Sequence, residues 1–291
     1  MELEPPPEVQ FTAVETTCPA AAERRRARSW SQLCDDLTSL SDELFEDLRM
    51  VTKDDGRMPA LCAGWDVRDI VLHLVVGDDL AERSLLGYDC FPQPTHDEKT
   101  LQAQSRQRVA KARATDLSAA VDDFRRGRER LIDYLGGLLP AEQGEKVSWA
   151  ARPISRFALV QSRLMETWIH GWDLRHPLAR NTPFDDRAWW VADMGVRHVP
   201  YALAKEGVEV AAMALTFNLD GTGGGLWCRE VGQTDAAAHT QPSPVLITGP
   251  SWAWVVAATR RRPGRSAALS ALDVVPAEAR AVLLGSARAF A

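Results

Sequence analysis

Apolar residues recur at helical spacing, with polar residues between them, as far as about residue 205. The first such stretch predicts a helix over residues 30–50. The apolar face of this helix is formed by Leu33, Leu37, Leu40, Leu44 and Leu48. The same spacing predicts further helices over residues 67–86, 117–139, 154–175 and 187–205.

Local signals place the ends of these helices. Asp66 is the expected N-cap of the helix over 67–86, and Thr115 is the expected N-cap of the helix over 117–139. Residues 87–100 contain two prolines and are an expected loop. The first four helices are expected to pack against one another as a bundle, because each has one apolar face to bury.

The pattern changes near residue 207 from helical spacing to short runs. Residues 208–219 largely alternate apolar and polar side chains, which predicts a strand, and a glycine-rich turn separates them from a second strand at 226–231. A third strand is expected at 244–248. Helices are expected at 252–261 and 276–290.

These patterns predict a mainly α protein with two folded parts. Residues 29–206 are expected to form a four-helix bundle, and residues 207–291 a small α+β domain. Residues 1–28 hold few apolar residues and a run of prolines, so we predict a disordered N-terminal tail there.

Composition and charge exclude several classes of function. The 291 residues carry a formal net charge of −6 and lack the basic patch that nucleic-acid binding requires, so no nucleic-acid partner is expected. No apolar run is long enough to cross a bilayer, and no signal-peptide core is evident, so we expect a cytoplasmic protein that does not contact membranes. The composition does not indicate an oligomeric state.

Three ionisable residues in two apolar stretches are the strongest indication of chemistry. Glu166 and His170 are four residues apart, so on a helix both lie on one face, roughly 6 Å apart between Cβ atoms. An imidazole from a facing helix, that of His73, completes a three-ligand site for a divalent metal. Three protein ligands leave one position open, as in catalytic zinc sites. The alternative is that His170 is a core histidine with Glu166 as its hydrogen-bond partner.

Two further residues lie close to this pattern. Asp173 follows His170 by three positions, so it can orient that histidine or accept a proton from metal-bound water. The alternative is a surface carboxylate that pairs with Arg175 or Arg180. Cys62 has no activating base evident near it in the sequence, and we interpret it as an inert thiol. No C-x-x-C pair occurs, so a cysteine-rich zinc site is not indicated.

Two strings carry a family resemblance. The first is Gly64-Trp65-x-Val67-x-Asp69-x-x-x-His73-Leu74, and the second is Arg163-Leu164-Met165-Glu166-Thr167-Trp168-x-His170-Gly171. With Asp173, they resemble the mycothiol-dependent maleylpyruvate isomerase family of the DinB-like metalloenzyme superfamily. The amino-acid sequence of the two strings is similar to that of an actinobacterial branch of this family, which consists of metal-binding, wyosine-base-formation-like proteins. The resemblance covers the chain from about Trp30 to the C-terminus.

The resemblance has consequences for fold and site. It implies a DinB-like bundle followed by a smaller domain similar to sterol-carrier-protein folds. It implies that His73, Glu166 and His170 are the metal ligands and that mycothiol is a thiol cosubstrate. It also implies that an arginine of the second domain assists the site, for which the candidates are Arg260, Arg261 and Arg262.

Three functions on a small-molecule substrate are open at this stage. In the first, the metal acidifies a thiol, mycothiol by resemblance, which adds to an electrophilic alkene or epoxide and gives isomerisation or S-conjugation. In the second, metal-bound water and Asp173 carry out hydrolysis or proton transfer. In the third, the protein is a non-catalytic carrier or sensor. The ligand set suits zinc, with iron, nickel and manganese as alternatives.

Overall fold

The computed structural model describes residues 28–91, 98–150, 153–207, 210–232, 241–261 and 264–289. Contacts divide these residues into two compact units, residues 28–194 and 195–289. The expected division lay near residue 207, whereas the division by contacts falls inside a helix. Apart from Arg28, the predicted disordered tail lies outside the described residues. Within the described ranges, no helix has the length and apolarity that crossing a membrane requires.

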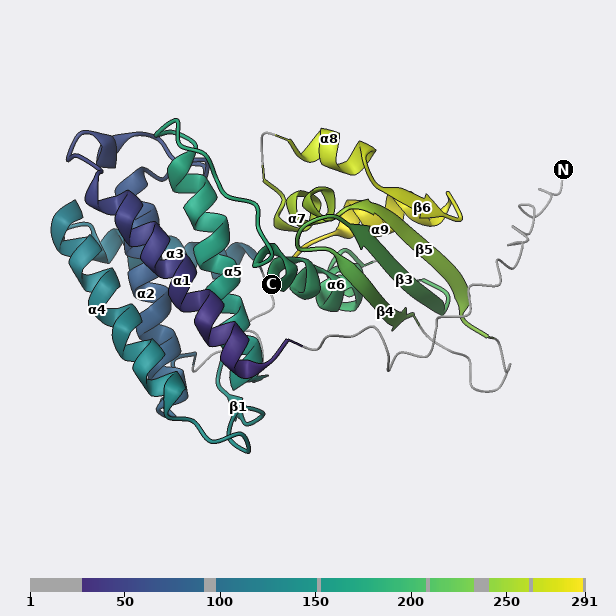
Figure 1. Cartoon of the computed structure of the whole chain (residues 1–291), viewed down its shortest axis with the longest axis horizontal. Helices are drawn as coiled ribbons and strands as arrows, with labels where there is room; N and C mark the ends of the chain where they lie inside the picture. Colours follow the sequence, from purple (N-terminus) through teal and green to yellow (C-terminus); the bar gives the residue numbers. More distant parts are fainter. Residues whose placement is uncertain are drawn as a thin grey trace, which may run out of the picture. The chain divides into compact units, whose positions relative to one another are not determined.

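The first unit is a bundle of helices, as predicted (Figure 1). α1 (Trp30–Arg49) packs against α4 (Leu117–Gly136) and α5 (Arg156–Arg175), and α2 (Val67–Leu85) also packs against both of these helices. α3 (Glu98–Ala112) lies against α2. The leucine face predicted for the first helix is buried along its length, which explains why its bounds agree with the sequence pattern.

The start of α2 determines where His73 lies. The side chain of Asp66 accepts the backbone N–H of Asp69 at 2.8 Å, and the carboxylate of Asp69 accepts the N–H of Asp66 at 3.2 Å. This reciprocal capping box satisfies donors that the first turn leaves unpaired, and it confirms the predicted cap. The predicted cap Thr115 is wrong, because Asp116 accepts the first-turn N–H of α4 instead.

The pattern of apolar residues missed α3 altogether. Residues 98–100 were expected to belong to a loop, and no helix was expected between residues 87 and 116. Among the described side chains of α3 only Val109 is buried, so the helix has no apolar stripe by which periodicity could reveal it. A short hairpin of β1 (Lys146–Val147) and β2 (Ile154–Ser155) leads into α5, and Ser155 caps that helix.

The second unit contains a four-stranded sheet in the order β4-β3-β5-β6. β3 (Met213–Asp220) and β4 (Gly225–Val231) form the predicted antiparallel hairpin. β5 (Ser243–Pro250) runs parallel to β3, and β6 (Asp273–Val275) pairs with β5. The first predicted strand therefore begins five residues later than expected, and β6 was not predicted because three residues show no alternation.

Helices complete this unit. α6 (Ala188–Lys205) contains Pro200 and passes through the boundary between the units. α7 (Ser251–Thr259) packs on β3 and β5, and α8 (Arg265–Ser270) packs against α7. α9 (Ala279–Ser286) is shorter than the helix predicted over 276–290. A mainly helical chain with a helical bundle first and the four-stranded sheet in the C-terminal part is the predicted fold class, which is confirmed.

Candidate metal centre

The packing of α2 against α5 brings together the three residues that the sequence analysis connected. Nε2 of His73, from α2, lies 3.2 Å from Oε2 of Glu166 on α5. Nε2 of His170, one turn further along α5, lies 3.0 Å from the same oxygen. We call His73, Glu166 and His170 the triad. Their donor atoms all lie within 4.8 Å of one another. Their role as metal ligands stays a prediction.

The charges of the triad follow from burial and hydrogen bonding. Burial raises the pKa of Glu166, but its bonds to His170 and His73 outweigh this effect and hold that pKa well below its ordinary value. Burial lowers the pKa of His73, and the bond to Glu166 offsets only part of the shift. Burial also acts to lower the pKa of His170, but hydrogen bonds to Asp173, Cys62 and Glu166 raise it well above its ordinary value.

Each imidazole has a second partner on its other nitrogen. Oγ of Ser105, from α3, lies 3.2 Å from Nδ1 of His73, and the ring of Trp65 lies 5.0 Å from the His73 ring between centroids. Oδ2 of Asp173 lies 2.9 Å from Nδ1 of His170. Both rings are therefore held with Nε2 towards Glu166, which is the arrangement that partners of metal-binding histidines impose.

Asp173 lies behind the triad and not at the protein surface. Its side chain has an exposed fraction of 0%. The alternative of a surface ion pair with Arg175 or Arg180 is wrong, because Nε of Arg175 donates to Asp47 at 2.6 Å and Arg180 also pairs with Asp47. This burial favours a role in orienting His170.

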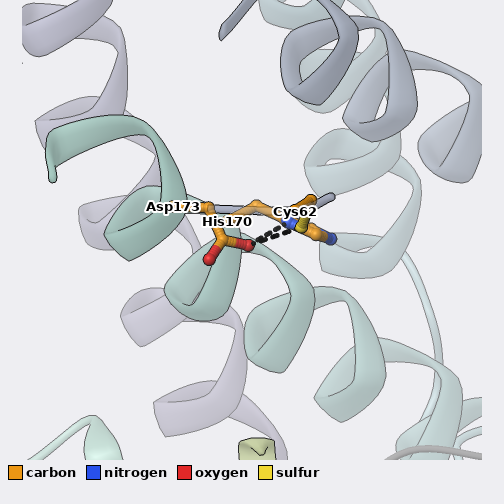
Figure 2. A group of neighbouring side chains, drawn as sticks. All are labelled: Cys62, His170 and Asp173. Carbon is orange, nitrogen blue, oxygen red and sulfur yellow. Dashed lines mark hydrogen bonds and ion pairs between the residues drawn. The ribbon is translucent and has the colours of Figure 1, made fainter. Parts of the chain in front are cut away.

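Sequence reasoning missed two residues at this centre, Ser105 and Cys62. Ser105 belongs to the unpredicted helix α3. No base was evident near Cys62 in the sequence, but the structure places its Sγ 3.2 Å from Oδ2 of Asp173 (Figure 2). Its interpretation as an inert thiol stays a prediction. Figure 2 shows Cys62 and His170 both directed towards this carboxylate. No local signal in the sequence points to the contact of Cys62 with Asp173, because the two residues are 111 positions apart.

A buried ionic cluster fixes α2, α4 and α5 one to two turns away from the triad. Asp78 of α2 accepts Nε of Arg128 at 2.9 Å and Nε of Arg163 at 2.9 Å. Arg128 also donates to Thr167, which follows Glu166 directly on α5. Because these groups are buried, a change in helix register would leave charges without partners, and the cluster thus maintains the register that the triad requires.

The three candidate arginines of the second domain are not brought into a site by the described contacts. Nη2 of Arg260 lies 3.3 Å from Oε1 of Glu206, and Arg261 donates to the carbonyl oxygen of Thr259 at 3.1 Å. Arg262 lies outside the described residues. The assistance of one of them stays a prediction.

The donor set of the triad fits a divalent metal. Two imidazole nitrogens and a carboxylate oxygen converge, and zinc accepts this combination in catalytic sites. The contacts of His170 with Glu166 and Asp173 raise the pKa of its imidazole and so favour a cation at this position, which a divalent ion can take over. The partial exposure of His73 and Glu166, 22% and 24% of their side chains, leaves a side from which a substrate can approach.

Sequence comparisons relate this centre to known proteins. Residues 37–175 match the sequence model of the mycothiol maleylpyruvate isomerase N-terminal domain. Two uncharacterized proteins from different strains of Mycobacterium tuberculosis are each 29% identical to this chain over 244 residues. The aligned residues cover 82% of this chain and 87% of each relative.

Structural comparisons extend the likeness to most of the chain. A crystal structure of the mycothiol-dependent maleylpyruvate isomerase matches with a TM-score of 0.55 at 14% identity, and a histidine-to-alanine mutant of that enzyme with 0.56 at 12%. Each match covers 80% of this chain and 90% of the other. These values establish the fold and nothing finer. Residues 37–175 thus match the family of the mycothiol maleylpyruvate isomerase N-terminal domain, and the chain has the fold of the mycothiol-dependent maleylpyruvate isomerase.

Proposed function

We propose that this protein is a metal-dependent enzyme that adds a small-molecule thiol, mycothiol, to a small electrophilic metabolite in the cytoplasm. The outcome is either isomerisation, when the thiol is eliminated again, or a stable S-conjugate. The family match supports the thiol and the isomerase chemistry. The chemistry of the triad supports the metal, for which we propose zinc.

The observation that carries this proposal is the convergence of two Nε2 atoms on one glutamate oxygen. The separations are 3.2 Å from His73 and 3.0 Å from His170. Both Nδ1 atoms are engaged elsewhere, by Ser105 and Asp173. A histidine that serves only to fill a core needs one hydrogen-bond partner, whereas two rings oriented towards a shared carboxylate are the arrangement of a three-ligand site.

Each residue of the centre then has a defined task. A divalent ion held by the triad would favour the deprotonated form of a bound thiol. Glu166 contributes negative charge that would make the bound ion less electrophilic, and its low pKa keeps the carboxylate ionised at neutral pH. Asp173 holds the Nδ1 proton of His170, so that the lone pair of Nε2 faces the triad. Ser105 does the same for His73.

The burial of Asp173 favours the thiol mechanism over the hydrolytic one. The hydrolytic alternative uses Asp173 as the proton acceptor for a metal-bound water, and this needs an accessible carboxylate. Asp173 is 0% exposed, and its Oδ2 already contacts His170 and Cys62. The thiol mechanism needs no proton acceptor at that position, because the thiol is acidified by its bond to the ion.

Metal content tests the triad. We expect purified protein to hold a divalent ion at the triad, and His73→Ala to lose it, as measured by elemental analysis after gel filtration. His176→Ala is the matched control, because His176 is an exposed histidine at the end of the same helix α5. Equal metal in wild type, His73→Ala and His176→Ala would refute the proposed ligands.

Activity with and without the thiol tests the reaction. The metal-loaded protein is incubated with maleylpyruvate or an electrophilic alkene, with mycothiol present or absent, and products are identified by mass spectrometry. We expect turnover only with mycothiol, and loss of turnover in His73→Ala. Thiol-independent turnover at the same rate would support the hydrolytic alternative, and metal binding without turnover of any substrate would support the carrier.

A further inference from the structure

We infer that Cys62, His170 and Asp173 form a second metal-binding set that shares the imidazole of His170 with the triad. The triad uses Nε2 of His170, whereas this set uses Nδ1 of the same ring. The inference goes beyond the proposed function, which involves one ion; the two share His170, and they share Asp173, which orients His170 in the proposed function and is itself a ligand in the second set. The ion expected at this set is zinc or a similar divalent cation that binds thiolate sulfur.

The spacing of the donor atoms is the first observation. Sγ of Cys62 lies 3.2 Å from Oδ2 of Asp173, and Nδ1 of His170 lies 2.9 Å from the same oxygen. These separations match those of the triad, where two nitrogens lie 3.2 Å and 3.0 Å from one oxygen. Tetrahedral zinc bonds of about 2.0–2.3 Å place ligand atoms about 3.3–3.7 Å apart. The separations in both sets are slightly shorter than this, and all donor atoms of each set lie within 4.8 Å of one another, so both sets are compact enough to close around an ion.

The backbone around Cys62 is the second observation. The N–H of Trp65 donates to the carbonyl oxygen of Cys62 at 3.1 Å, and Ala60 donates back to Trp65 at 2.9 Å. Gly64 takes a φ of 81° in this turn, a conformation that strains other residues. The turn leads directly into the capped start of α2. The thiol is therefore held against Asp173 by a closed loop and not by a freely moving segment.

The chemistry of the donors is the third observation. A thiolate, an imidazole and a carboxylate are the three ligand types of zinc, and soft thiolates select it over magnesium or calcium. Asp173 is fully buried and its Oδ2 lies against Nδ1 of His170, so a cation bound there would interact with a carboxylate that solvent does not screen. Cys62 is only partly buried, which leaves a side of the set open. Filling the set releases the protons of the Cys62 thiol and of Nδ1 of His170 to solvent.

The competing interpretation is that Cys62 only donates a hydrogen bond to Asp173. Cobalt(II) distinguishes the two, because a cobalt–thiolate bond gives a charge-transfer absorption in the near ultraviolet that nitrogen and oxygen ligands do not give. The metal-free full-length protein is titrated with cobalt(II), and both this absorption and the visible absorption of tetrahedral cobalt are followed. We expect the visible absorption to grow beyond one equivalent, and the sulfur absorption to accompany it.

Variants assign the signals to the two sets. Cys62→Ser should lose the sulfur absorption and keep the visible absorption of the triad. Cys34→Ser is the matched control, since Cys34 is another partly buried free cysteine, on α1, and it should behave as wild type. His73→Ala should keep the sulfur absorption. Circular dichroism and thermal unfolding of each metal-free variant confirm that the fold is retained.

The outcomes separate this inference from the proposed function. Visible absorption that ends at one equivalent in wild type, without sulfur absorption, overturns the second set and leaves the triad in place. Sulfur absorption in wild type and His73→Ala, with no cobalt bound by Cys62→Ser, supports the second set and overturns the triad as a metal site. Sulfur absorption that persists in Cys62→Ser also overturns the inference, because another cysteine would then be the ligand.

Discussion

Replacing Asp78 by asparagine removes the charge that two buried guanidinium groups share. Asp78 is 1% exposed, and it accepts hydrogen bonds from Arg128, which is 0% exposed, and from Arg163. Burial lowers the pKa of Arg128, and the charge of Asp78 offsets only part of this, which shows how costly the buried cation is. In Asp78→Asn both cations remain without a counter-charge.

The expected loss is large relative to the stability of a domain. Breaking a buried ion pair by removing one partner costs about 3–5 kcal/mol of unfolding free energy. With an m-value of roughly 2 kcal/mol per molar urea, this lowers the unfolding midpoint by about 1.5–2.5 M. Because Arg163 lies one turn before Glu166 on α5, the folded fraction of Asp78→Asn should also bind metal more weakly.

Urea unfolding of the full-length chain, followed by tryptophan fluorescence and circular dichroism, measures this loss. Glu82→Gln is the matched control, since Glu82 also lies on α2 and also pairs with an arginine of α4, Arg130, whose side chain is 58% exposed. An exposed pair contributes less than about 1 kcal/mol, so the control midpoint should move by less than about 0.5 M. Equal shifts in the two variants would refute the argument that burial makes the Asp78 cluster strong.

Four smaller predictions follow from the same structure. Asp173→Asn should weaken metal binding about 10–100-fold in a chelator competition, because His170 loses its orienting partner; unchanged affinity would exclude that role. Ser105→Ala should weaken it about 2–10-fold, since one neutral hydrogen bond to His73 is lost. Burial raises the pKa of Cys34 to about 11, so its alkylation, followed by mass spectrometry, should speed up about tenfold per pH unit below that value, and a plateau near pH 9 would contradict this. Asp66→Ala should lower the unfolding free energy by about 1 kcal/mol through loss of the α2 cap, measured by urea unfolding.

The sequence by itself determined α1, α2, α4 and α5 of the bundle and connected the members of the triad, but it showed no sign of α3. Leucine spacing predicts a buried helix face because both the period and the burial are properties of one short segment, and α1 follows that pattern from Trp30 to Arg49. The spacing of Glu166 and His170 likewise places them on one face without knowledge of any partner. His73 could be assigned to the triad because it lies in an apolar stretch and because the motif around it resembles that of a known family.

Only the tertiary structure decided what surrounds the triad. Ser105 reaches His73 from α3, a helix whose polar sequence leaves no periodic trace, and Cys62 meets Asp173 from 111 positions away in the chain. The parallel pairing of β3 with β5 also joins segments that are distant in the sequence, because β4 lies between them. The spacing of residues within one segment cannot predict such contacts, because each contact depends on the free energy of burying two distant segments against each other.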